Sequence, residues 1–113
     1  MDFLNCLKKF EFVKHIEIVD LRIFKGGFFI KIKAYLSDKS HLFIREYVDS
    51  CERNYSYHWQ DTQGNLIARW DNAPHYPEII TYPHHKHLEG EILPNYSIAC
   101  EEILEEIGKM LHK

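Results

Sequence analysis

The sequence predicts an α+β domain in which an antiparallel sheet of about five strands carries a short N-terminal helix and a longer C-terminal helix packed on it. Three observations predict this class. In residues 28–36 every second residue from Phe28 to Leu36 is apolar, and the residues between are Phe29, Lys31, Lys33 and Tyr35, as in a half-buried strand. The segments on either side repeat the alternation and are joined by short turn sequences, which favours consecutive hairpins. Helical stripes of apolar residues occur near the two ends of the chain.

Length and composition indicate one domain that spans residues 1–113. Domains most often contain roughly 100–150 residues, and one hydrophobic core serves a chain of this size. The hydrophobic fraction of 45% and the charged fraction of 27% are typical of a globular chain. No apolar run is long enough to span a bilayer, and the first residues lack a signal-peptide layout. We therefore expect a cytoplasmic protein that does not bind membranes.

The charge distribution limits the partners of the chain. A formal net charge of -3 argues against a general nucleic-acid binder, because such affinity comes from neutralising phosphates with many Lys and Arg side chains. The acids are unevenly placed, however, since residues 1–50 hold nine Lys/Arg against seven Asp/Glu. A locally basic face therefore stays compatible with the sequence.

The first half of the chain predicts a helix and three strands. Asp2 is placed to cap the short N-terminal helix. The apolar parity shifts near Val19, which indicates a β-bulge in the first strand. After the turn at residues 37–40, an odd-length connection keeps the apolar faces of the second and third strands together. The expected pairs are Leu36 with Leu42, Ala34 with Ile44, and Ile32 with Glu46.

Glu46 is exceptional among these residues because that register places its carboxylate on the covered face. An unpaired carboxylate is unfavourable there, so we expect a partner, such as Arg69 or a histidine. The alternative is a general base with a raised pKa.

The second half predicts another hairpin and the C-terminal helix. Gly64 suits the left-handed position of a three-residue turn, which places His58 and Arg69 on adjacent strands. Residues 73–96 contain all four prolines and show no sustained period, so we expect an ordered excursion over the surface. Ser97 is the expected cap of the last helix.

Histidines gather in this second half. Four of the eight fall within residues 75–87, and His58 lies on the strand pair that leads into this segment. Histidine titrates near neutral pH, so two of them can serve as base and acid in one turnover, while Arg69 can stabilise phosphate charge. Such a set suffices for RNA cleavage by a metal-independent endoribonuclease. The candidate catalytic residues are His58, Arg69, His75, His84, His85, His87 and Glu46.

Aromatic and polar side chains near the histidines are candidates for substrate binding. Aromatic rings can stack on unpaired bases, although packing in the core is the more common role of such rings. Lys31, Lys33 and Arg45 lie on the sheet face opposite the apolar one, where they can follow phosphates or simply form a solvated face. The candidate substrate-binding residues are Tyr57, Trp59, Trp70, Asp71, Asn72 and Lys86.

Three other interpretations of the histidine segment stay open. The histidines and Asp71 can hold a zinc ion as in a zinc-dependent hydrolase, although His84 and His85 would point in opposite directions in an extended segment. The side chains can instead tie up loop backbone by local hydrogen bonds, or form a non-enzymatic interface for a partner protein. Because the sequence contains no recognised metal or cofactor motif, the leading interpretation includes neither a metal nor a cofactor.

Several strings of residues occur here in the order found in a known family. They are residues 36–40 (LSDKS), 45–47 (REY), 55–61 (YSYHWQD), 64–75 (GNLIARWDNAPH) and 83–87 (PHHKH). Together they resemble the TumE-like toxin family, and the resemblance covers residues 12–112. It implies the toxin of a type II toxin-antitoxin pair, inhibited by a small antitoxin protein encoded by an adjacent gene. RNA or the ribosome is the target that we expect, and RNA cleavage is inferred from the residues and not from the resemblance.

The chain departs from the family pattern at two positions. Lys39 stands where the family usually has glycine, which predicts a less tight turn. Tyr76 follows His75 where the family often has a second histidine, so a mechanism that needs a histidine at position 76 is not expected here.

Overall fold

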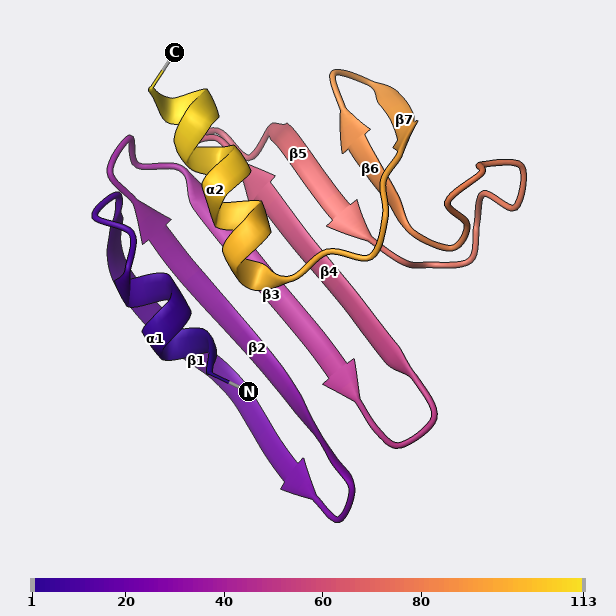
Figure 1. Ribbon diagram of the computed structural model, residues 1–113. Coiled ribbons are helices and arrows are strands. Elements are labelled where there is room, and N and C mark those ends of the chain that lie inside the picture. The colour runs from indigo at the N-terminus through magenta and orange to yellow at the C-terminus, as the bar shows by residue number, and fades with distance from the viewer. Residues whose placement is uncertain (1, 113) are drawn as a thin grey trace.

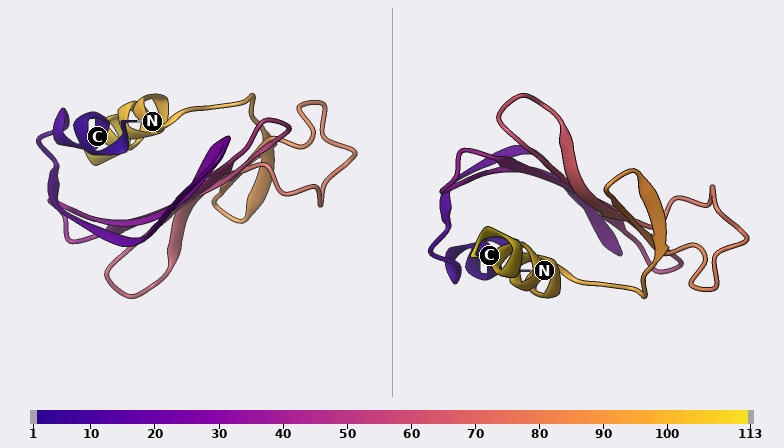
Figure 2. Two further views of the ribbon diagram at one scale, coloured as in Figure 1. Left: turned by 90° about the horizontal axis from the view of Figure 1, so that it is seen from below. Right: turned by 90° about the horizontal axis from the view of Figure 1, so that it is seen from above.

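The computed structural model describes residues 2–112 and forms one sheet of seven antiparallel strands (Figure 1). Each strand pairs with its neighbours in sequence, so the sheet is a meander. Both helices lie on one face of the sheet, whereas the other face, here called the open face, carries no helix of the described residues (Figure 2). The elements are α1 (Phe3–Lys8), β1 (Val13–Phe24), β2 (Gly27–Leu36), β3 (His41–Val48), β4 (Arg53–Gln60), β5 (Leu66–Asp71), β6 (His85–Leu88), β7 (Glu91–Pro94) and α2 (Cys100–Leu111).

The predicted α+β class is confirmed, but the sheet has two strands more than expected. β6 and β7 come from residues 73–96, which were expected to form an ordered excursion over the surface without strands. Glu89 and Gly90 form the turn between them with φ angles of 51° and 79°, the positive values that a two-residue hairpin turn requires. Each of the two strands is four residues long, which is too short for alternation to be recognised in the sequence.

The core fills the space between the sheet and the helices. Alternate residues of the central strands face it, and α2 contributes one apolar stripe. Burial of each large side chain stabilises the fold by roughly 1.5–3 kcal/mol, so this layer fixes which face of every strand is covered. The most deeply buried members include Leu7, Ile32, Ala34, Leu42, Ile44, Tyr57, Trp70, Ile103, Leu104 and Ile107.

The expected register between β2 and β3 is wrong by two residues, although their apolar faces coincide as expected. A shift of two residues preserves the face of every side chain. The connecting turn is shorter than expected because Ser40 donates its backbone N–H to Asp38 Oδ1 at 3.0 Å. Lys39 completes the turn in the left-handed region, with a φ of 72°. The observed pairs are Ala34 with Leu42, Ile32 with Ile44, and Ile30 with Glu46.

The start of α2 also differs from the expectation. The helix begins at Cys100 with Ala99 at the N-cap position, so the predicted cap by Ser97 is wrong. Glu102 accepts a hydrogen bond from the Ala99 backbone N–H at 3.1 Å and replaces the missing side-chain cap. Ser97 Oγ instead accepts a hydrogen bond from Arg53 at 3.4 Å.

Other local expectations are confirmed. The register of β1 shifts between Ile18 and Asp20, where the bulge was predicted. Gly64 has a φ of 85°, which is the left-handed conformation expected in the turn between β4 and β5. His58 lies directly opposite Arg69 across these two strands.

Candidate functional site

Five of the chemically active side chains lie together on the open face of the sheet. His58 on β4 is directly opposite Arg69 on β5, and Arg69 is directly opposite His87 on β6. Asp71 and His85 form the next cross-strand pair on the same face. Because strands alternate their side chains, residues two apart share a face. The sheet therefore brings together residues from positions 58 to 87.

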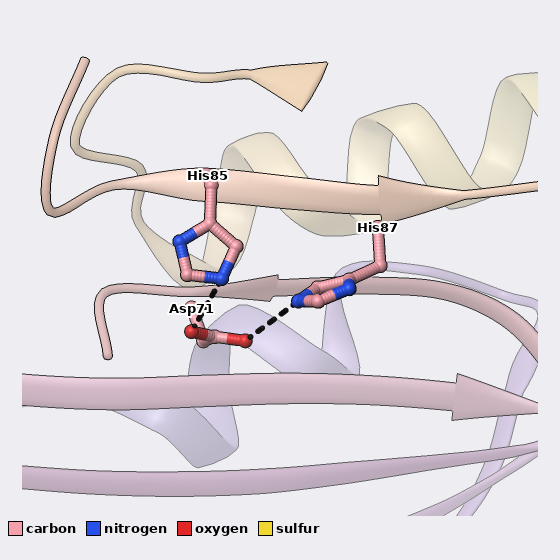
Figure 3. A group of neighbouring side chains, drawn as sticks. All are labelled: Asp71, His85 and His87. Carbon is pink, nitrogen blue, oxygen red and sulfur yellow. Dashed lines mark ion pairs between the residues drawn. The ribbon is translucent and has the colours of Figure 1, made fainter. Parts of the chain in front are cut away.

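Asp71 lies at the centre of this cluster (Figure 3). Asp71 is only 3% exposed, and Arg69 donates Nε–H to its Oδ2 at 2.9 Å. The backbone N–H of Ala73 donates to Oδ1 at 2.9 Å. A buried carboxylate is tolerated when its oxygens are bonded to donors and paired with a cation, and Asp71 meets both conditions.

His85 is held by contacts at both ring nitrogens. Its Nδ1–H donates to the Pro83 carbonyl oxygen at 3.0 Å, and its Nε2 lies 2.9 Å from Asp71 Oδ1. Each bond needs a proton on its nitrogen, so the pair is fully bonded when the imidazole carries both protons and Asp71 is ionised. With only 2% of the residue exposed, His85 is a poor candidate for direct contact with substrate.

His87 is more accessible than His85 and less tightly held. Its side chain is 21% exposed, and Nε2 lies 3.5 Å from Asp71 Oδ2, beyond the usual hydrogen-bond range. Burial lowers the pKa of His87 below its ordinary value, and the carboxylate of Asp71 offsets part of that effect. The imidazole of His87 therefore lies beside the Asp71 carboxylate and is still accessible to solvent.

The hydrogen bonds of His58 define its protonation state. Arg69 can only donate, so its Nη1–H bonds to Nδ1 of His58 at 3.1 Å. The other nitrogen, Nε2, carries the proton and donates to Gln60 Oε1 at 3.2 Å. Burial, and then the positive charge of Arg69, lower the pKa of His58, so the ring is neutral near pH 7.

The loop between β5 and β6 folds over part of this cluster. The ring of Tyr76 lies 4.9 Å from that of His85 and 5.9 Å from that of His87, both edge-on. His75 is exposed, and its ring centroid is 6.5 Å from that of Tyr76. Tyr76 was not a sequence candidate; the signals for it were its position within the histidine segment and the histidine that the family often has at this position.

Glu46 and His84 belong to the helix-covered face, so the sheet separates them from the cluster. Arg53 donates Nε–H to Glu46 at 2.6 Å, and the hydroxyl of Tyr57 donates to Glu46 at 2.7 Å. The expectation that Arg69 or a histidine pairs with Glu46 is therefore wrong. His84 Nδ1 bonds to the Tyr55 hydroxyl at 2.8 Å. The opposite orientations expected for His84 and His85 are observed.

Most of the side chains considered for substrate binding have structural contacts instead. Tyr57, Trp59 and Trp70 are at most 2% exposed, so their rings pack in the core and do not reach a base. Asn72 accepts a hydrogen bond from the Tyr55 backbone and donates to the Arg53 carbonyl.

Lys86 also lies on the helix-covered face. It donates to Glu106 on α2 at 2.8 Å, and its Nζ is 5.1 Å from the ring centroid of Trp70. Among the candidates for substrate binding, Asp71 is the one that lies in the open-face cluster.

The cluster also contains a set of metal-ligand atoms. Asp71, His85 and His87 each offer an atom, and these atoms all lie within 4.8 Å of one another. Two histidines and a carboxylate form a common ligand set for zinc and other transition metals.

Comparisons with known proteins identify the family of this chain. The family model described as Toxin TumE matches residues 3–111. Neither the search of curated proteins nor that of solved structures found a significant match. No helix in the described residues is long and apolar enough to cross a membrane. Since the family model spans almost the whole chain, the protein belongs to the TumE toxin family.

Proposed function

We propose that this chain is the toxin of a type II toxin-antitoxin pair and arrests growth by cleaving RNA through metal-independent acid-base chemistry. The observation that carries the proposal is the row His58, Arg69 and His87 on three adjacent strands of the open face. The two histidines are two strand spacings apart, about 9.5 Å between backbones, with the guanidinium between them. Two titratable groups on either side of a fixed cation suit a phosphodiester bound at the middle position.

The chemical step follows from the hydrogen bonds at the site. His58 is neutral and loses its bond to Arg69 when the guanidinium turns to a phosphate, so its Nδ1 accepts the proton of the ribose 2′-hydroxyl. The 2′-oxygen then forms a bond to phosphorus, and the bond from phosphorus to the 5′-oxygen breaks. His87 in its protonated form gives a proton to that leaving oxygen. The products are a 2′,3′-cyclic phosphate and a 5′-hydroxyl.

Asp71 and His85 support this step without contacting the substrate. Asp71 orients Arg69 through the 2.9 Å bond to Nε and favours the protonated form of His87. His85 holds Asp71 from the other side at 2.9 Å. Because a shift of about 0.5 Å in a catalytic group weakens catalysis, this buried pair acts as the positioning layer of the site.

The test is induced expression of the wild type, His58→Ala, His87→Ala and the control His84→Ala. The control substitution removes a histidine from the helix-covered face, away from the proposed site. This variant is therefore expected to arrest growth like the wild type. We expect the other two variants, shown to be folded, to lose growth arrest and the new RNA 5′ ends. Arrest by the wild type with intact RNA would contradict the proposal and favour a protein-binding module.

A second test examines the products directly. Purified protein should leave a 2′,3′-cyclic phosphate, and an oligonucleotide with a single 2′-deoxyribose at the cleaved position should resist cleavage. Equal cleavage of the deoxy-substituted strand would rule out attack by the 2′-oxygen. The antitoxin encoded by the adjacent gene is expected to bind the chain and suppress both activities.

A zinc-dependent hydrolase is the second candidate, favoured by the ligand atoms of Asp71, His85 and His87. His85 donates from Nδ1 to a carbonyl, the usual outer contact of a histidine that binds metal through Nε2. Against this candidate, Arg69 lies 2.9 Å from the Asp71 carboxylate, and a guanidinium repels a second cation. Bound zinc below about half an equivalent, with cleavage insensitive to chelation, would reject it.

A further inference from the structure

A groove on the open face leads to the proposed cleavage site. It has a volume of about 580 Å³ and runs over β1, β2, β3, β4 and β5. His58 and Arg69 form one end of it, so a strand lying in the groove reaches the row of catalytic candidates. The other lining residues that matter here are Lys31, Phe43, Arg45 and Ser56.

The groove contains two cations placed directly opposite each other. Lys31 on β2 is the cross-strand partner of Arg45 on β3, and both are exposed. Like charges in this position destabilise a sheet. Neither side chain takes part in an ion pair among residues 2–112. Asp20 on β1 is directly opposite Lys31, but its carboxylate pairs with Arg22 at 3.3 Å. Two adjacent cations whose donors contact no carboxylate are suited to an anionic ligand.

Arg45 and the neighbouring cation on β2, Lys33, rest on aromatic rings. The guanidinium of Arg45 lies 5.1 Å from the ring centroid of Phe29. Lys33 Nζ lies 4.9 Å from the ring centroid of Tyr35 and 5.5 Å from that of Phe43. These contacts hold the charged groups on the face and leave their donors free for phosphate oxygens.

Phe43 connects the cations to the acid-base residues. It is the cross-strand partner of Lys33 on one side and of His58 on the other, and its ring centroid is 6.2 Å from that of His58. The residue is partly exposed. A ring in this position can stack with an unpaired base, whereas a binding site for an acidic polypeptide has no need of one.

We propose that this groove binds single-stranded RNA beside the cleaved bond, with Lys31 and Arg45 on a phosphate and Phe43 against a base. The inference rests on the proposed function for its choice of RNA. It also explains how a chain with a net charge of -3 binds a polyanion. The acids Glu101, Glu102, Glu105 and Glu106 are on α2, and α2 lies on the far side of the sheet (Figure 2).

The test measures binding of a fluorescent 2′-O-methyl oligoribonucleotide, which cannot be cleaved because the attacking hydroxyl is blocked. The variants are Lys31→Gln/Arg45→Gln and Phe43→Leu. The matched control is Lys8→Gln/Lys109→Gln, which removes two exposed charges from the helices. Fluorescence anisotropy at several salt concentrations gives the affinity and its salt dependence.

We expect the groove double variant to lower the slope of log affinity against log salt by about 0.7, because the two cations share one phosphate and each neutralised phosphate on a single strand contributes about 0.7. Phe43→Leu should weaken binding about 5- to 150-fold, the equivalent of about 1–3 kcal/mol for a stacked base, without changing the slope. The control should behave like the wild type. Since the double variant removes a repulsion, its stability to urea should be unchanged or higher.

Unchanged affinity and slope in the groove double variant would overturn the proposal. A second result would also overturn the proposal: a poly-glutamate peptide competes with RNA for the protein, and Phe43→Leu binds RNA normally. That combination would indicate a site for an acidic protein segment. Cleavage is measured separately on the matching RNA. If RNA binding depends on the groove residues but the wild type does not cleave RNA, the proposed function is rejected and the binding groove stands. If the wild type cleaves RNA and both groove variants bind RNA normally, the binding groove is rejected and the proposed function stands.

Discussion

Replacing Arg69 with lysine tests the centre of the site while keeping one positive charge there. The guanidinium donates to His58 Nδ1 at 3.1 Å and to Asp71 Oδ2 at 2.9 Å. When a phosphate binds, the donor on Asp71 stays in place and the donor on His58 is released, which leaves four of the five donors for the phosphate. An ammonium group is a single point charge and cannot hold Asp71 and make a bidentate contact with a phosphate in one geometry.

We expect kcat/KM for RNA cleavage to fall about 10²- to 10³-fold in Arg69→Lys, because loss of one positioned donor to a transition-state oxyanion costs about 2.7–4 kcal/mol. Most of the loss should appear in kcat, since the retained charge still attracts the substrate. The pKa of His58 should stay below its ordinary value of 6.5 in this variant, because burial and the neighbouring positive charge, the two causes that lower it, are both retained.

The assay combines steady-state cleavage of an oligoribonucleotide with an NMR pH titration of the His58 ring. Arg22→Lys is the control, since the side chain of Arg22 is 73% exposed on β1. A folded Arg69→Lys protein with unchanged kcat/KM would refute a role for the guanidinium fork in the transition state. A pKa of His58 at or above 6.5 in this variant would contradict burial as the main cause of its lowered value.

Four further predictions concern stability and pH. Arg53→Met should lower the free energy of unfolding by about 3 kcal/mol, because the Glu46 side chain, 8% exposed, loses its partner; urea denaturation measures it, and a loss under about 1 kcal/mol would contradict a buried pair. The lowered pKa values of His58 and His87 place the optimum of kcat/KM below pH 6.5. The lowered pKa values mean that the two histidines bind protons more readily in the unfolded chain than in the folded one, so the melting temperature should drop as pH falls below 6.5. An optimum of kcat/KM at alkaline pH would contradict the first of these two predictions, and a higher melting temperature in acid would contradict the second. Lys39→Gly should raise the free energy of unfolding by about 0.5–1 kcal/mol by relieving the left-handed conformation at a φ of 72°, and a lower urea midpoint would argue against strain there.

Features that depend on neighbouring residues could be predicted from the sequence. The alternation in β2, the bulge near Val19 and the left-handed Gly64 each follow from the local pattern, and each is observed. The adjacency of His58 and Arg69 follows as well, since a hairpin turn of known length determines which residues pair. These predictions need no knowledge of the rest of the chain.

Features that depend on distant contacts were predicted poorly. Arg53 was not considered as the partner of Glu46, although the two strands that carry them are adjacent. Tyr76 packs over the histidines only because the loop between β5 and β6 folds back onto the open face. No periodicity in the sequence encodes the path of such a loop.

The sequence by itself determined the α+β class, the order of the central strands and the group of titratable residues from which a site can be built. Tertiary structure decided which members of that group meet. His84 and His85 are neighbours in sequence, yet one contacts Tyr55 beneath the helices and the other contacts Asp71 on the open face. The reason is physical: pairing of the short β6 with β5 sets the face of each residue, and the four residues of β6 carry too little pattern to reveal that pairing in advance.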